Sequence, residues 1–183
     1  MKKIILTSLL LAVSTFAECT YYSENAKVTW KAFKTYEKIG VGGTFDHVVF
    51  SPRSAKTSEE FLVGSNITIN TSTVNSGNAG RDATLVASFF KTQNVESITA
   101  KIISVKDSKA QVDITMNGVT KQIPMSYTIH EGKITGKGVI DLSDFAMLKS
   151  LQSINKTCFD LHAGKTWQDV EIGFEIPIAN NCY

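Results

Sequence analysis

Hydrophobic and polar residues alternate along most of this chain. In residues 170–178, valine, isoleucine and phenylalanine occupy every second position, and glutamate, glycine and proline fill the others. Residues 28–32, 61–69 and 98–102 follow a similar alternation. Because successive side chains of a β-strand point to opposite faces, this period of two predicts strands with one buried face.

Three dipeptides between the apolar runs are typical of tight hairpin turns: Asp107-Ser108, Asn117-Gly118 and Glu131-Gly132. Asn117-Gly118 is the strongest of them, because asparagine and glycine tolerate the positive φ angles that a two-residue hairpin turn requires. The strand-like runs number about eight, at the spacing of an all-β barrel or sandwich with antiparallel neighbours.

Two segments interrupt the alternation, and each predicts a short helix. Residues 75–90, NSGNAGRDATLVASFF, begin with a glycine-rich turn and end in two phenylalanines. Residues 143–154, SDFAMLKSLQSI, offer Ser143 as an N-cap and apolar residues at helical spacing, namely Phe145, Leu148, Leu151 and Ile154. Since a β-barrel has two open ends, we expect these helices to cover the interior there.

The first residues have the layout of a secretory signal peptide. Lys2 and Lys3 precede an apolar run from Ile4 to Val13, and small residues follow at Thr15 and Ala17. The run is too short for a permanent membrane span, so we expect cleavage after Ala17, a single domain over 18–183, and a periplasmic or secreted protein without stable membrane insertion. A lipoprotein anchor at Cys19 is the alternative, which Glu18 before it disfavours.

Loss of Lys2 and Lys3 from the 19 basic residues leaves as many bases as the 17 acids. The mature chain then has no net charge, and no basic patch or stripe indicates nucleic acid as a partner. The three histidines are scattered, so we expect no metal site, no cofactor and no catalytic group. The exception is Cys158 with His162, which share a helical face at this spacing, as a nucleophile and base would; a buried thiol and a loop histidine are the alternative.

Four short sequence motifs follow one another between residues 41 and 145. They are VGGTFD at 41–46, VNSGN at 74–78 running on to Arg81-Asp82 and Phe89-Phe90, NGVTK at 117–121, and IDLSDF at 140–145. In this order they resemble the YceI-like, or polyisoprenoid-binding, family of bacterial exported proteins. The chain departs from the family pattern in its three cysteines, in Gly43, and in a longer segment 158–167 before the last strand.

The resemblance implies an eight-stranded antiparallel lipocalin-like barrel with one or two short helices near the ends. It also implies a periplasmic carrier that holds a long-chain apolar ligand: a polyisoprenoid, an isoprenoid quinone, or a fatty acid or amide. We expect the ligand to contact inward-facing apolar residues: Trp30, Phe45, Ile67, Ile69, Phe89, Ile98, Met116, Met125, Tyr127, Phe145, Leu148 and Phe174. Polar residues expected at the mouth are Arg81, Asp82, Ser143 and Asp144. The alternative is structural: Arg81 and Asp82 pair and cap their own helix, and Ser143 and Asp144 serve only as an N-cap.

Two other functions remain open from the sequence. One is a lipid-acting enzyme that uses Cys158 and His162, and the other is a stress-related interaction module that presents its outer surface or pairs into a homodimer. In a barrel whose last strand returns antiparallel to the first, we expect a Cys19–Cys182 disulfide and a free Cys158.

Overall fold

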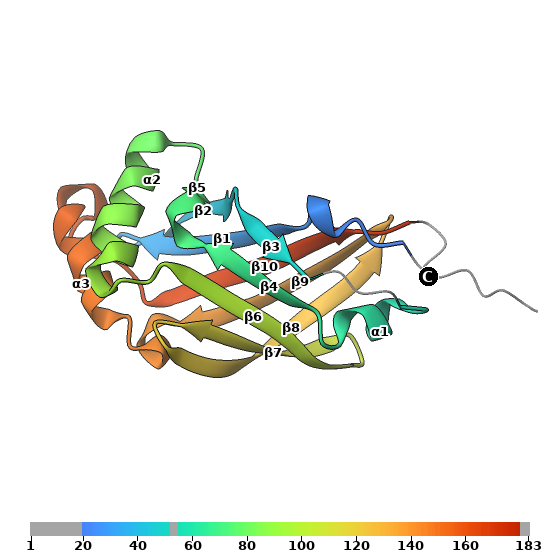
Figure 1. Cartoon of the computed structure of the whole chain (residues 1–183). Coiled ribbons are helices and arrows are strands. Elements are labelled where there is room, and N and C mark those ends of the chain that lie inside the picture. The colour runs from blue at the N-terminus through green and yellow to red at the C-terminus, as the bar shows by residue number, and fades with distance from the viewer. Residues whose placement is uncertain (1–19, 52–54, 180–183) are drawn as a thin grey trace, which may run out of the picture.

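The computed structural model of the chain describes residues 20–51 and 55–179, and its strands form one curled antiparallel sheet (Figure 1). The described strands lie in the order β3-β4-β6-β7-β8-β9-β10-β1-β2-β5. Their bounds are β1 Lys27–Lys34, β2 Ile39–Phe45, β3 Val48–Phe50, β4 Asn66–Asn70, β5 Val74–Asn75, β6 Ser97–Lys106, β7 Lys109–Met116, β8 Val119–His130, β9 Lys133–Asp141 and β10 Asp169–Pro177.

The sheet has ten strands where about eight were predicted, because two long stretches of extended chain are each divided into two strands. Only Asp46 and His47 separate β2 from β3, and the 3-10 turn η2 (Thr71–Thr73) separates β4 from β5. The interruptions face one another: the amide of Asp46 donates to Thr73, and the amide of Asn70 to His47. The pair β2–β5 lies at one edge of the sheet and the pair β3–β4 at the other. Because the chain runs from β2 into β3 and from β4 into β5, these pairs join the two edges of the curl. The all-β lipocalin-like prediction is confirmed.

The three predicted hairpin turns are confirmed. They connect β6 to β7, β7 to β8 and β8 to β9. In each turn both residues have positive φ, for example 53° at Asn117 and 73° at Gly118. Such turns match the right-handed twist of the strands, so the four strands form one continuous antiparallel meander.

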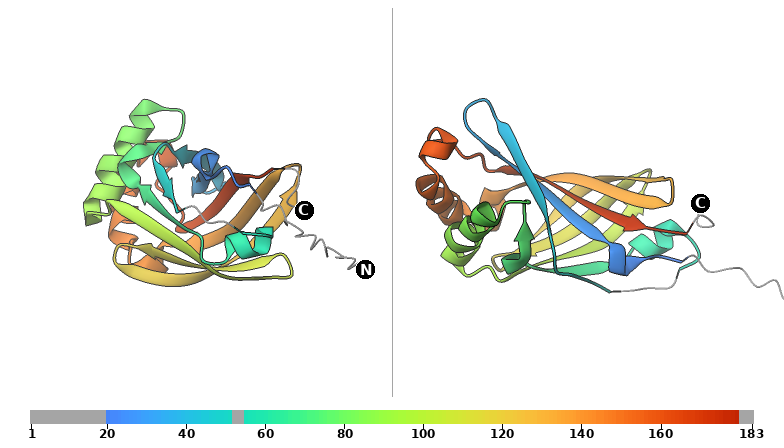
Figure 2. Two further views of the ribbon diagram at one scale, coloured as in Figure 1. Left: turned by 45° about the vertical axis from the view of Figure 1, so that its right-hand side comes forward. Right: turned by 90° about the horizontal axis from the view of Figure 1, so that it is seen from above.

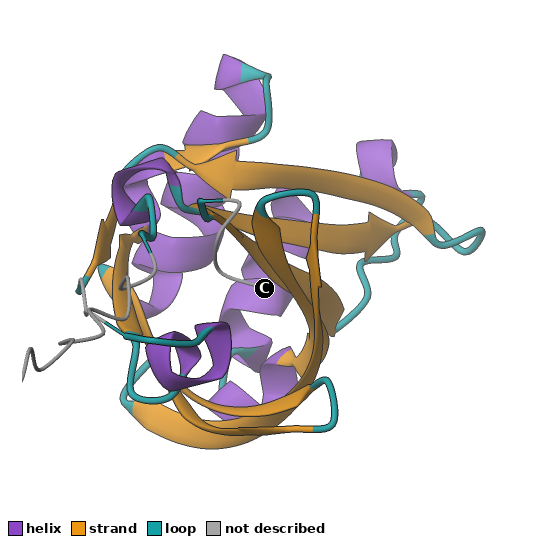
Figure 3. Ribbon diagram, turned by 90° about the vertical axis from the view of Figure 1, so that its right-hand side faces the viewer, coloured by secondary structure: helices purple, strands orange, loops and turns teal. Residues whose placement is uncertain are grey.

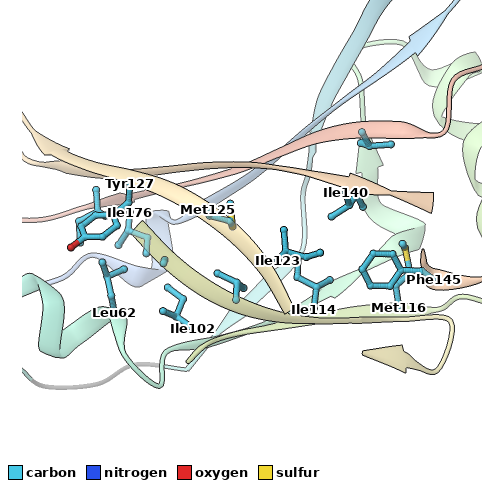
Figure 4. Close-up of a cluster of buried hydrophobic side chains, with 14 of the residues drawn as sticks. Leu62, Ile102, Ile114, Met116, Ile123, Met125, Tyr127, Ile140, Phe145 and Ile176 are labelled. Carbon is cyan, nitrogen blue, oxygen red and sulfur yellow. The ribbon is translucent and has the colours of Figure 1, made fainter. Parts of the chain in front are cut away.

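The alternation of apolar and polar residues also determines which side chains form the core. Every second residue of β7 is buried, and Ile114 and Met116 pack there with Ile123 and Met125 of β8 (Figure 4). The prediction for β10 is confirmed too: Val170 and Ile176 are buried, and Ile178 continues the pattern. The inward face of the sheet is therefore apolar along its length.

The predicted strand over 61–69 is wrong in its first half. Residues Ser58–Leu62 form the helix α1, with Thr57 accepting a hydrogen bond from the amide of Glu60 as N-cap. Phe61 is 1 % exposed and stacks on Tyr21 and on Phe50, with ring centroids 3.6 and 5.8 Å apart. One turn of helix therefore fills one end of the barrel with side chains.

Helical segments cover the opposite end (Figures 1 and 2). They are α2 (Ala79–Leu85), the π-helical turn η3 (Val86–Phe90), η4 (Lys91–Gln93), η5 (Leu142–Phe145), α3 (Leu148–Thr157) and η6 (Asp160–His162); a further turn, η1 (Ser23–Asn25), precedes β1. The helix predicted for 75–90 is confirmed, and its N-cap is Asn78, which accepts from the amide of Arg81 at 2.9 Å.

The continuous helix predicted over 143–154 is wrong. Ala146, with a left-handed φ of 54°, divides it into η5 and α3. The cap of η5 is Asp141 rather than Ser143: the Asp141 carboxylate accepts from the amide and the hydroxyl of Ser143, at 2.8 and 2.6 Å. These hydrogen bonds hold the pKa of Asp141 below its usual value.

The ends of the described chain lie side by side. Tyr21 bridges Ile178, and the amide of Ala179 donates to Thr20 at 2.9 Å. This is the antiparallel return on which the Cys19–Cys182 prediction depends, but both cysteines, like the expected signal peptide, lie outside the described residues, so the bond stays a prediction. Within the described part of the chain, no helix has the length and apolar character needed to span a bilayer.

Candidate functional site

An apolar cavity of about 570 Å³ runs through the interior of the curled sheet. Figure 3 looks into the curl from the α1 side, with strands around the interior and helices behind. Inward side chains of β1, β4, β6, β7 and β10 form its wall, and α2, η3 and α3 close the helical end. This volume lies within the range of small-molecule sites, about 300–1,000 Å³.

Most of the predicted lining residues reach this cavity: Trp30, Phe45, Ile67, Ile69, Phe89, Ile98, Met116, Met125 and Phe174. They come from seven strands and from η3, and alternation brings them to one face. Their contact with a ligand stays a prediction. Both phenylalanines of the 75–90 segment contribute, since Phe89 and Phe90 both line the cavity, with ring centroids 5.1 Å apart.

Three predicted lining residues lie elsewhere. Tyr127 is buried in the core beside Leu62 and Ile176 (Figure 4), where burial, and then the charges of Glu59 and Asp107, raise the pKa of its phenol. Phe145 is completely buried next to Met116, and its carbonyl accepts from the Asn117 side chain at 3.1 Å.

Leu148 is 43 % exposed, because the break at Ala146 turns the start of α3 toward solvent. Two later residues of the same helix, Leu151 and Ile154, line the cavity instead. Sequence spacing had placed all three on one helical face, and the break in the helix is what separates them.

The inward glycines of β9 do not hold the cavity open. Gly136 pairs with Phe174, and a Cβ at Gly136 would collide with the Phe174 ring. A Cβ at Gly138 would lie 2.8 Å from the Met125 side chain. Large neighbours therefore occupy the space that the glycines leave, and the smaller inward residues that line the cavity include Ala32 and Ala100.

Of the four predicted polar residues at the mouth, Arg81 lines the cavity, and Asp82, Ser143 and Asp144 do not. The Arg81 guanidinium donates to the hydroxyl and the carbonyl of Ser76, at 2.7 and 2.9 Å. Asp82 accepts from the amide and the hydroxyl of the same serine. The Asp82 carboxylate therefore stabilises the turn that precedes its own helix. Ser143 is hydrogen-bonded to Asp141, and Asp144 is exposed.

A second polar group lies at the helical end, on the segment before β10. Cys158, His162 and Thr166 line the cavity together with Lys34 of β1. His162 Nδ1 and Thr166 Oγ1 are 2.8 Å apart, and the Thr166 hydroxyl donates to Asn155 Oδ1 at 2.9 Å. The sequence indicated only the pair Cys158 and His162; Thr166 and Lys34 are brought in by a bridge between β1 and the loop.

The electrostatics of this group do not resemble an activated nucleophile. Burial raises the pKa of the Cys158 thiol, against a smaller opposing effect of Lys34, and burial and the Lys34 charge both lower the pKa of His162. The thiol is therefore protonated and the imidazole neutral near neutral pH, whereas a catalytic cysteine needs a stabilised thiolate. Cys158 is a free, half-buried thiol. Across residues 20–51 and 55–179, no three His, Cys, Asp or Glu side chains gather as a metal site would require.

The β1–β2 hairpin reaches toward the end of the molecule where α3 lies (Figure 2), and Trp167 is hydrogen-bonded to this hairpin. Its indole N–H donates to the carbonyl of Thr35 at 2.7 Å, and the ammonium groups of Lys38 and Lys165 lie 4.9 and 4.6 Å from its ring. Trp167 also lines the cavity. It was not predicted as a site residue, because a tryptophan in a loop carries no periodic signal.

A family model described as a YceI-like domain matches residues 20–178. No curated protein matches the chain. Among solved structures, a polyisoprenoid binding domain from Saccharophagus degradans is 13% identical with a TM-score of 0.60, covering 88% of this chain and 96% of its own. BcnA of Burkholderia cenocepacia is 16% identical with a TM-score of 0.59, covering 88% and 100%. A Campylobacter jejuni YceI protein is 17% identical with a TM-score of 0.53, covering 98% and 94%.

Proposed function

The chain belongs to the YceI-like family, and from this we propose that it is a carrier that encloses one long-chain apolar molecule, a polyisoprenoid, an isoprenoid quinone, or a fatty acid or amide. The observation that carries the proposal is the apolar cavity inside the sheet. A barrel of this size is able to fill itself with side chains, and protein interiors normally leave no such void. The S. degradans domain, which is described as polyisoprenoid binding, supports this ligand class.

Transfer of the chain out of water supplies the driving force. At about 0.8 kcal/mol for each buried methylene, a chain of about 18 carbons gains on the order of 14 kcal/mol before ordering and association costs. This gain depends little on chemical identity. Specificity then rests on the length of the cavity and on the polar groups at its end.

Export belongs to the proposal as well. Lys2, Lys3 and the apolar run that follows support a cleaved signal peptide and a periplasmic or secreted carrier. Pairing into a homodimer and a stress-related role of the outer surface stay predictions. For the lipid-acting enzyme, loss of turnover in Cys158→Ser with uptake intact would be the supporting result.

Filling the cavity tests the proposal. Ala100 of β6 lines the cavity, and its neighbour Thr99 is exposed on the other face of the same strand. Ala100→Trp should weaken uptake of an apolar fluorophore at least tenfold, because the indole occupies ligand space. Thr99→Trp is the matched control and should bind as the wild type does.

Circular dichroism and thermal unfolding would establish that both variants are folded. Equal uptake by folded Ala100→Trp and wild type would contradict binding inside the barrel. Absence of uptake by the wild-type protein, for prenyl and acyl chains alike, would contradict the carrier function itself.

A further inference from the structure

On the largely apolar wall of the cavity, Lys34, His162 and Thr166 form a polar group at the helical end. Two of its members lie in the loop before β10, and Lys34 pairs with Thr166 across an isolated antiparallel bridge. Polar groups on the wall of a buried apolar cavity cost free energy unless they have partners, so their hydrogen bonds need to be followed individually.

The directions of these hydrogen bonds are fixed by the chemistry of the last acceptor. The carbonyl of Gly164 is only able to accept, so Asn155 presents its amide Nδ2 there, at 3.2 Å, and its Oδ1 toward Thr166. The Thr166 hydroxyl must then donate to Oδ1 and accept from His162. His162 Nδ1 therefore carries a hydrogen, and in the neutral ring Nε2 is left with a lone pair.

Burial and the charge of Lys34 keep the His162 imidazole neutral. Burial and the positive charge of Lys34 both lower the pKa of His162, which disfavours a second proton on the imidazole. Among the described residues no hydrogen-bond partner of Nε2 and no ion pair of Lys34 is recorded. This polar group thus offers one acceptor, His162 Nε2, and one cationic donor, the Lys34 ammonium.

We propose that this group is the head-group subsite of the carrier and that it takes a neutral hydroxyl, whose O–H donates to His162 Nε2 while its oxygen accepts from Lys34. This inference rests on the proposed function. A long-chain alcohol or a quinol meets both requirements. An ether lacks the hydrogen, and a carboxylate would set a negative oxygen against the Nε2 lone pair. Thr166 and Asn155 are positioning residues, since they fix which ring nitrogen carries the hydrogen.

Three probes with the same chain separate these possibilities: farnesol, its methyl ether and farnesoate, each displacing an apolar fluorophore. The wild type should bind farnesol about fivefold more tightly than the ether, the gain expected for one neutral hydrogen bond. His162→Leu should reduce this ratio to about one while the ether still binds, and Thr166→Val should reduce it partly. His130→Leu, at the exposed end of β8, is the matched control and should keep the full ratio.

An NMR measurement on the wild-type protein tests the same hydrogen bond without any substitution. In wild-type protein labelled with 15N in its histidine side chains, farnesol should shift the Nε2 resonance of His162, and the ether should not. The inference is overturned if farnesoate binds the wild type more tightly than farnesol, or if the alcohol preference survives in folded His162→Leu. If the ether and farnesol bind equally well to the wild type, the subsite is wrong and the carrier function stands. If none of the three displaces the fluorophore, the subsite is wrong, and the carrier function fails with it if acyl chains do not displace the fluorophore either.

Discussion

The two ends of the barrel are closed in different ways: side chains fill one end, and helices cover the other. At the α1 end, the stacked rings of Tyr21, Phe61 and Phe50 fill the interior, and Leu62 is completely buried. At the helical end, α2, η3 and α3 cover the opening but leave the cavity beneath them. The same alternating strands run through both ends. The difference shows that the segments added to the sheet, rather than the sheet itself, decide where ligand space remains.

The largest effect is expected at the packed end. Phe61→Ala removes a ring with 1 % exposure, so it should lower the free energy of unfolding by about 3–5 kcal/mol. Chemical denaturation followed by tryptophan fluorescence would measure the loss. Val49→Ala, on exposed β3, is the control and should change stability by less than about 0.5 kcal/mol. A loss at Phe61 as small as that of the control would show that the α1 end is not tightly packed.

The same truncation should cost less at the hollow end. Phe89 is half-buried and already borders the cavity, so Phe89→Ala should lower the free energy of unfolding by roughly 1–2 kcal/mol. It should also enlarge the space for ligand and permit bulkier chains. Denaturation and fluorophore displacement on one preparation would measure both. A loss equal to that of Phe61→Ala would remove the distinction between the two ends.

A substitution at Asp141 tests how much the N-cap of η5 contributes to stability. Asp141→Ala removes the acceptor of two Ser143 hydrogen bonds and of one from Gln168 Nε2 at 2.8 Å, so we expect a loss of about 1 kcal/mol. Because hydrogen bonding lowers the pKa of Asp141 in the folded state, this stabilisation is present above the unfolded pKa and lost as the pH falls through the folded one.

Comparison of the wild type and Asp141→Ala between pH 7 and acid conditions would check this dependence. The difference in their stabilities should shrink as the solution becomes acidic. A constant difference across this range would mean that the carboxylate charge contributes nothing to the cap.

The smallest effect concerns His162. Its pKa is lowered in the folded state, so the unfolded chain binds the proton more readily, and stability should decline slightly as the pH falls below about 6.5. His162→Leu should remove this part of the pH dependence, and His130→Leu should not. Thermal unfolding between pH 5 and 8 is the measurement. An identical slope in the wild type and His162→Leu would contradict a buried neutral imidazole.

The sequence predicted those features that depend on local chemistry. Alternation located β10 correctly, and Asn117-Gly118 required a hairpin turn. It misplaced Phe61, because one helical turn followed by a strand imitates a longer alternating run. It missed the break at Ala146, because nothing in an alanine signals a left-handed φ, and Leu148 was misassigned as a result.

The candidate site was predictable only in part for a related reason. Period two identifies which side chains point inward, but not whether neighbours fill the space they leave. Gly136, for example, has no side chain to fill the interior, but the Phe174 ring occupies the space beside it. Thr166 and Lys34 meet across a contact distant in sequence, which no local pattern records.

Native mass spectrometry of the protein purified from its own cells, with organic extraction of what it carries, would show whether the barrel holds a ligand. We expect one long-chain molecule for each barrel, lost on extraction and regained when a prenyl or acyl chain is added. An empty protein that takes up neither kind of chain would contradict the proposed carrier function.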